Sequence, residues 1–308
     1  MQELRKDKPF AVILPGFLGS SEDFEDLARD LRRAGYGAAV APISWWHWIP
    51  CVGGRSMRPI LERIDFAVNQ VLEDLNTTSI SPPSYTLQDF LVDFLTNPGG
   101  ILKVGGTDDP ADYPALTPRG DDFASPASPG SGRRVALVAH SAAGWISRVY
   151  LSGVNYGGRS FKGSKKVHSL VCLGSPHFVA ENLVFKSLQY LEREEGSALP
   201  ARVRCLCVGA KGAVLSKASD MTRGAYELCG AMPGDDDVDG DGMTPLFSAV
   251  ALDSADDKMV LENVSHAPVY PAFGPSAKLA EERLTKPWYG SPEILKKWFP
   301  WLKASTMD

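Results

Sequence analysis

The chain has 308 residues, of which 44% are hydrophobic, and a formal net charge of -5 at pH 7. This length and apolar content suffice for one large α/β core, and an acidic balance without a basic stripe argues against a nucleic-acid-binding surface. The amino terminus lacks an apolar signal core, and no segment approaches the roughly 18 consecutive apolar residues of a membrane span, so we expect a soluble protein.

Strands and helices alternate along the chain. Short unbroken apolar runs predict buried strands, whereas apolar residues at 3.6-residue spacing predict amphipathic helices. Such alternation favours an α/β fold with a mostly parallel, doubly wound sheet. We expect strands at 10–14, 37–43, 135–139, 167–173, 203–208 and 258–264, and helices at about 20–34, 58–75, 145–151, 180–195 and 294–302.

Residues 76–132 differ from their surroundings in composition. The segment is dense in Ser, Pro, Gly and Asp, with one short helical candidate at 87–96. This composition predicts an insertion or flexible loop, a candidate lid, within a single domain spanning 1–308.

A serine stands where the 135–139 strand must turn sharply into the next helix. The turn reads Ala139-His-Ser141-Ala-Ala143, with small residues on both sides of the serine. This arrangement is typical of the nucleophile elbow of α/β-hydrolases, whose usual pattern is G-x-S-x-G. Both glycines are alanines here. Ser141 is the predicted nucleophile; the simpler interpretation is an ordinary serine in a strand-to-helix turn.

A serine nucleophile needs a histidine base and an orienting carboxylate, which follow it in the order acid, then histidine in this fold. Of the five histidines, only His266 lies far enough downstream to follow an acid-bearing loop. Asp241 precedes Gly242 and a stretch that returns to the core, so it is the preferred acid. The alternatives are Asp239, Asp237 and Asp253.

The same acidic loop also imitates the first half of a calcium-binding loop. Asp237, Asp239 and Asp241 alternate before Gly242, but position twelve is Ser248 where an EF-hand requires a bidentate Glu. We therefore favour the catalytic interpretation, which requires no metal and no organic cofactor.

An oxyanion site needs two backbone N–H donors. The amide of Ala142, directly after the predicted nucleophile, should supply one of them. The second should come from Phe17, because Pro15-Gly16 ends the first strand and Gly16 lets the backbone approach closely.

Several short motifs follow one another in a fixed order, at 14–17, 45–48, 57–60, 139–150, 155–158, 172–177, 240–245, 264–268 and 286–292. Through them the chain resembles lipase-like α/β-hydrolases, particularly the plant and cyanobacterial proteins called GPI inositol-deacylase-like. The resemblance covers most of the chain outside 76–132. It implies Ser141, Asp241 and His266 as nucleophile, acid and base, and a plastid or cyanobacterial setting. The chain departs from the pattern at Ala143, where glycine is usual.

These features predict hydrolysis of a carboxylic ester, with a lipid acyl ester as the expected substrate. Substrate contacts are expected from Trp45, Trp46, His177 and Phe178. His177 is expected to be a pocket wall or structural residue. The tryptophans could instead pack the insertion onto the core, and an acyltransferase or a non-catalytic binding protein could share this fold.

The remaining expectations concern the cysteines and the carboxyl terminus. Five cysteines form no C-x-x-C pair, which favours a reducing compartment, plastid or cytoplasm. Cys205 and Cys207 should face the same side of a strand and pack as small apolar groups. The helix at 294–302 should pack on the sheet, with transient membrane-surface contact as the alternative.

Overall fold

The structure is a computed structural model that describes residues 8–52, 56–74, 77–80, 133–157, 159–181, 183–195, 198–232, 234–267 and 286–306. The helix predicted at 87–96 and nearly all of the 76–132 insertion lie outside these residues. The lid role of the insertion therefore stays a prediction.

The described residues form one six-stranded sheet in which every neighbouring pair is parallel. The strand order is β2-β1-β3-β4-β5-β6, so the chain starts near one edge, crosses back, and then adds strands in one direction. This all-parallel sheet confirms the predicted α/β class and is consistent with an α/β-hydrolase. The strands are β1 (Phe10–Leu14), β2 (Gly37–Val40), β3 (Val135–His140), β4 (Val167–Leu173), β5 (Arg204–Lys211) and β6 (Asp257–Glu262).

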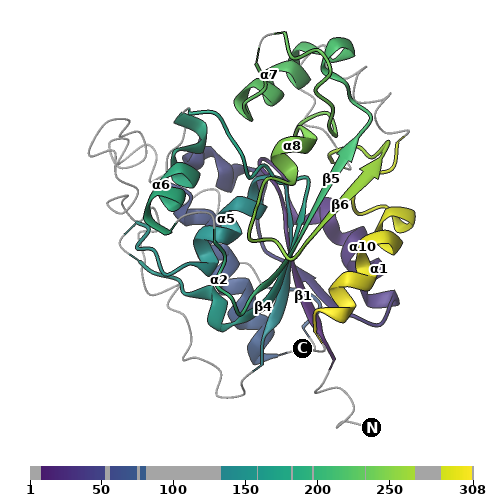
Figure 1. Cartoon of the computed structure of the whole chain (residues 1–308). Helices are drawn as coiled ribbons and strands as arrows, with labels where there is room; N and C mark the ends of the chain where they lie inside the picture. The colour runs from purple at the N-terminus through teal and green to yellow at the C-terminus, as the bar shows by residue number, and fades with distance from the viewer. Residues whose placement is uncertain are drawn as a thin grey trace.

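Helices cover both faces of the sheet (Figure 1). On one face lie α2 (Arg58–Glu73), α5 (Ala142–Leu151) and α6 (Lys186–Glu195), which share one core cluster with side chains of β1, β3 and β4. On the other face lie α1 (Glu25–Arg33) and α10 (Pro292–Ala304). Central strands buried on both faces explain why they read as continuous apolar runs.

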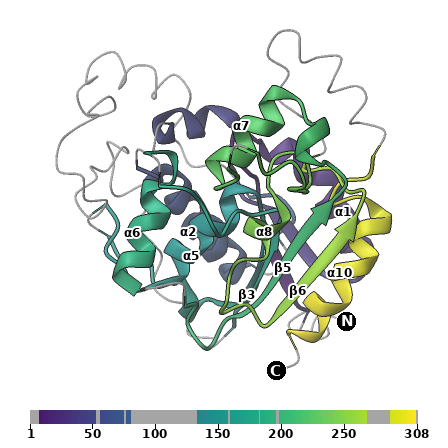
Figure 2. The same cartoon turned by 45° about the horizontal axis from the view of Figure 1, so that its top comes forward.

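Two short helices stand at the side of the sheet where the strands end (Figures 1 and 2). They are α7 (Asp220–Leu228), whose first turn is capped by the Ser219 hydroxyl, and α8 (Leu246–Ala249), which packs against β5. The sequence pattern predicts neither helix, because each is shorter than the roughly ten residues over which helical periodicity becomes readable.

Some element boundaries differ from the prediction for identifiable reasons. The strand expected at 37–43 ends at Val40, because the Ile43 amide bonds to the carbonyl of Ala41 and the chain turns away. In contrast, β5 extends to Lys211, since its last residues pair with β6. The helix expected from about 180 begins only at Lys186, after a 3₁₀ turn.

The carboxyl-terminal helix packs as expected. Ile294, Leu295, Trp298 and Leu302 of α10 are buried in the core cluster shared with α1. Within the described ranges, none of the helices is long and apolar enough to cross a membrane.

Candidate active site

Ser141 sits on the strained turn that its sequence context predicts. It follows β3 directly and occupies the N-cap position of α5 without a side-chain capping bond, with φ 52° and ψ -128°. A positive φ is costly for a residue with a Cβ, at roughly 1–3 kcal/mol, and such strain concentrates at functional sites. The turn leaves Ser141 at the positive end of the α5 dipole, where negative charge is stabilised.

The loop after β1 lies tightly against this serine. A Cβ added to Gly16 would stand 2.7 Å from the Ser141 Cβ and 2.6 Å from His140 Nδ1. Only glycine leaves room for this approach. The next residue is Phe17, so its backbone follows directly from the point of closest contact, and its exposed ring packs edge-on against Trp48.

Asp241 and His266 meet in a buried hydrogen bond, with 2.8 Å between Asp241 Oδ2 and His266 Nδ1. Tyr289 donates its hydroxyl to the same oxygen at 2.8 Å. The other oxygen, Oδ1, accepts the backbone N–H groups of Met243 at 2.9 Å and Thr244 at 2.7 Å. Both carboxylate oxygens are thus fully engaged, and each side chain is held in one orientation.

These contacts keep the carboxylate charged. Burial by itself would raise the pKa of Asp241, but the positive charge and hydrogen bond of His266 and the two backbone donors outweigh it and lower that pKa. An ionised Asp241 accepts a hydrogen bond from His266 Nδ1–H. Whenever the imidazole is neutral, this bond leaves its lone pair on Nε2, the atom needed to take a proton from a serine.

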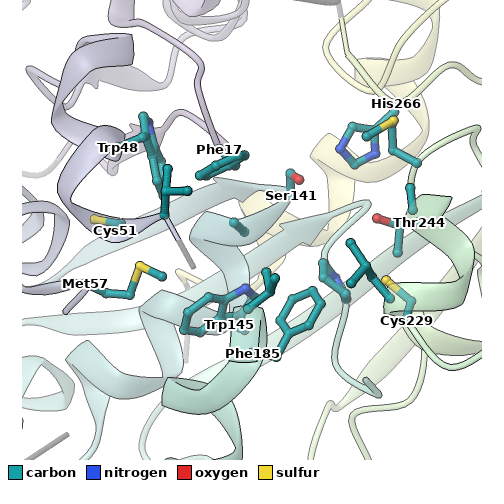
Figure 3. A pocket seen from close by; sticks show the side chains of 17 residues that line it. Phe17, Trp48, Cys51, Met57, Ser141, Trp145, Phe185, Cys229, Thr244 and His266 are labelled. Atoms are coloured by element: carbon teal, nitrogen blue, oxygen red, sulfur yellow. The ribbon is translucent and has the colours of Figure 1, made fainter. Parts of the chain in front are cut away.

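Ser141 and His266 line the same cavity, which has a volume of about 380 Å³. Figure 3 shows the serine hydroxyl between Phe17 and the His266 ring. In the described part of the chain, the Ser141 hydroxyl and the His266 ring are not joined by a hydrogen bond. Most of the remaining wall is apolar, including Trp48, Met57, Trp145, Val184, Phe185 and Leu228.

His140 links the serine turn to the histidine loop. Its Nε2 lies 2.7 Å from the backbone carbonyl oxygen of His266, so the ring donates and its Nδ1 carries no proton. Burial, followed by the nearby His266 charge, lowers the pKa of His140 to about 3. The expected chain order of the catalytic groups leaves His140 out, because it stands directly before the serine.

The alternative acids differ from Asp241 in their surroundings. Asp239 Oδ1 accepts the backbone N–H groups of Gly212, Ala213 and Gly240. Asp237 and Asp253 are exposed. In the part of the chain that the structure describes, no three carboxylates lie close enough together to share an ion.

The four residues expected to contact substrate do not line this cavity. Trp45 is half-exposed, and Trp46 stacks on His47. Phe178 is exposed and His177 is buried. Their substrate contacts stay a prediction, whereas the neighbouring Trp48 does line the cavity. The tryptophan cluster in the sequence indicated that this segment borders the cavity, but not which of its rings points inward.

Known proteins give this chain no family. No family model matches the chain, and no curated protein matches it. One similar solved structure is an extracellular α/β-hydrolase from a Paenibacillus species, described as sharing structural and functional homology with tobacco salicylic acid binding protein 2. It is 12% identical, and the match covers 91% of this chain and 88% of that chain with a TM-score of 0.28. A similarity this low supports no inference about the function of this chain. The fold class therefore rests on its own parallel sheet.

Proposed function

We propose that the chain is a serine esterase that hydrolyses carboxylic esters with an apolar acyl group, the class to which lipid esters belong. One observation carries the proposal. His266, which is hydrogen-bonded to Asp241, lines the same cavity as Ser141. This serine is held at a positive φ at the amino terminus of a helix.

The reaction follows from the roles of these three groups. His266, oriented by Asp241, takes the proton of Ser141 as the serine oxygen attacks the ester carbonyl. Protonated His266 then gives that proton to the departing alcohol, leaving an acyl-enzyme. Water, deprotonated by the same imidazole, attacks the acyl carbon, and the serine recovers its proton as the acid leaves.

The negative oxygen of each tetrahedral intermediate needs donors in a fixed position. The backbone N–H groups of Ala142 and Phe17 are the proposed pair, one at the start of α5 and the other on the loop that Gly16 brings against the serine. Loss of one such donor costs about 3 kcal/mol in the barrier.

The cavity lining supports an apolar acyl group as the bound part of the substrate. Its volume of about 380 Å³ lies in the range of small-molecule sites, and its few polar side chains include those of Ser141, Thr244 and His266. Phe17, Val52, Val184 and Leu228 line it while remaining substantially exposed, so apolar surface continues outward to solvent. This arrangement favours an alkyl chain over a charged acyl group.

The test is labelling by a fluorophosphonate, combined with hydrolysis of p-nitrophenyl esters of increasing acyl length. We expect labelling and turnover in the wild type and neither in Ser141→Ala. Ser152→Ala, at the opposite end of α5, is the matched control and should retain both. An unlabelled wild type, or a Ser141→Ala variant as active as the wild type, would refute the proposal. Turnover in the presence of a competing alcohol distinguishes hydrolysis from acyl transfer, since only a transferase forms mainly the new ester.

A further inference from the structure

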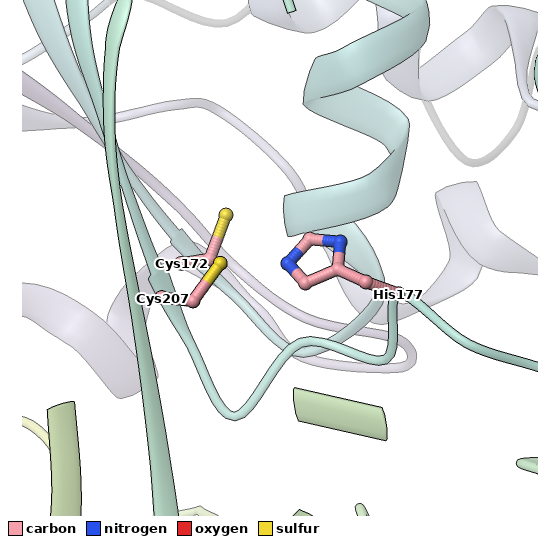
Figure 4. Close-up of side chains that lie close together, drawn as sticks. All are labelled: Cys172, His177 and Cys207. Carbon is pink, nitrogen blue, oxygen red and sulfur yellow. The ribbon is translucent and has the colours of Figure 1, made fainter. Parts of the chain in front are cut away.

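Two cysteines and a histidine form a second buried group of reactive side chains, here called the Cys–His cluster: Cys172, His177 and Cys207. One ligand atom from each residue lies within 4.8 Å of the others. Figure 4 shows the two thiols side by side, with the imidazole directed toward them. Both cysteines are free and fully buried, and His177 is 4% exposed.

The sheet register builds this cluster. Cys172 of β4 and Cys207 of β5 are paired residues on adjacent parallel strands, so their side chains leave the same face of the sheet next to each other. His177 lies on the loop that follows β4. Its backbone N–H bonds to the carbonyl of Ser248 in α8, which fixes the loop against the strands.

Beyond the thiols that it faces, the His177 ring has no hydrogen bond that would explain its burial. Neither Nδ1 nor Nε2 has a partner at ordinary hydrogen-bond geometry among the described residues, although the residue is more than nine-tenths buried. A buried polar group left without a partner costs roughly 1–3 kcal/mol, so native structures rarely leave both nitrogens of a ring in this state. A lone pair directed at two thiols would be satisfied by a metal ion among them.

We propose that the Cys–His cluster binds Zn²⁺ through Cys172 Sγ, Cys207 Sγ and one ring nitrogen of His177. Thiolate sulfur and imidazole nitrogen are the donors that this ion prefers, at about 2.3 Å and 2.0–2.1 Å. Two thiolates balance the charge of the ion, so the buried site stays neutral. Binding releases the two thiol protons to solvent and changes no oxidation state.

The site is separate from the proposed catalytic group. His177 does not line the cavity of Ser141, and neither cysteine contributes to its wall. The ion would join β4, the loop after it, and β5. Its expected role is therefore structural: it holds the loop that begins at Gly174 against the sheet.

The test uses full-length protein stripped of metal with a chelator and kept reduced. Titration with Zn²⁺ should give about one bound ion per chain, held by the three protein ligands and by one water molecule as the fourth ligand. Titration with Co²⁺ should give a thiolate-to-metal charge-transfer band. Cys207→Ser and His177→Ala should each weaken Zn²⁺ binding by more than about 100-fold. Cys51→Ala, which removes a buried thiol elsewhere, is the matched control and should bind normally.

The Co²⁺ spectrum of the wild type decides the question even where a variant fails to fold, and circular dichroism identifies that case. The thermal midpoint of the wild type should also rise with Zn²⁺, whereas that of a folded His177→Ala variant should not. Absence of the thiolate band would overturn the proposal. So would Zn²⁺ binding equal to that of the wild type in both variants, or a Cys172–Cys207 disulfide as the resting state.

Discussion

His140 donates a hydrogen bond from Nε2 to the backbone carbonyl of His266 across 2.7 Å. The residue directly before the proposed nucleophile therefore holds the loop that carries the proposed base. The two residues are 126 positions apart, and the end of β3 brings them together. In effect, one imidazole positions the backbone of the other.

This contact makes His140 a positioning residue whose loss should affect turnover more than binding. In His140→Phe the donor is gone and the His266 loop can shift, so we expect kcat to fall by roughly 10- to 100-fold while KM changes little. His140→Gln restores a donor of similar reach and should recover part of kcat. Steady-state kinetics on a p-nitrophenyl ester measures both. Equal losses in the Phe and Gln variants would contradict the positioning role.

Tyr289 should matter for both stability and the pKa of Asp241, because its hydroxyl donates to Asp241 Oδ2. Tyr289→Phe removes a hydrogen bond to a buried charge, which costs about 1.5–3 kcal/mol of unfolding free energy. It should also raise the pKa of Asp241, because the ionised carboxylate loses a hydrogen-bond donor. Urea unfolding measures the first effect, and an NMR titration of the Asp241 carboxyl carbon measures the second. Tyr36→Phe, which alters a buried tyrosine outside the cavity lining, should leave the pKa of Asp241 unchanged.

The site shows what sequence reasoning could find. Chain order pointed to Ser141, Asp241 and His266, because the roles in this chemistry follow one another in a fixed sequence. The structure brings Asp241 and His266 into contact, whereas the alternative acid Asp239 accepts a backbone N–H of another loop. The strand pattern was likewise readable, since strands buried on both faces are continuous apolar runs.

Other features depend on contacts that no local pattern records. Tyr289 reaches Asp241 over 48 residues, and its motif carries no sign of this. Trp48, not Trp45 or Trp46, lines the cavity because the 3₁₀ turn at Trp45–Cys51 docks with Trp48 Nε1 donating to the Gly19 carbonyl. The approach of Cys172 to Cys207 required the register between β4 and β5, which was unknown before the fold.

Acid should destabilise the protein through histidines that are buried without charge. His47 Nδ1 accepts the Ser44 backbone N–H at 2.7 Å, and burial, followed by the charge of Arg63, lowers the pKa of His47 to about 2. In the unfolded chain the pKa is near 6.5. As the pH falls below that value, the unfolded state binds a proton that the folded state refuses. The contribution of His47 to the unfolding free energy is therefore fully present above about pH 6.5. It is lost progressively as the pH falls from there toward the folded-state pKa of about 2.

Between about pH 7 and pH 5, His47 alone should therefore remove about 2 kcal/mol of unfolding free energy. The glutamine of His47→Gln can still accept the Ser44 bond but does not titrate. Urea unfolding at both pH values should show a smaller loss in this variant by about the same amount. An identical loss in wild type and variant would mean that His47 is not a source of the acid sensitivity.

Gly16 provides the sharpest test of how the oxyanion site is assembled. A Cβ there would lie 2.7 Å from the Ser141 Cβ and 2.6 Å from His140 Nδ1, closer than real Cβ atoms approach. In Gly16→Ala the loop must retreat and carry the Phe17 amide with it, so we expect kcat to fall by about 100-fold or more, as after loss of one oxyanion donor. Gly224→Ala is the matched control, because an added Cβ meets nothing within 4 Å in α7. That change should leave kcat unaltered and stabilise the fold by roughly 0.5–1 kcal/mol, since alanine favours helix. A Gly16→Ala variant with wild-type kcat would show that the amide of Phe17 does not hold the oxyanion.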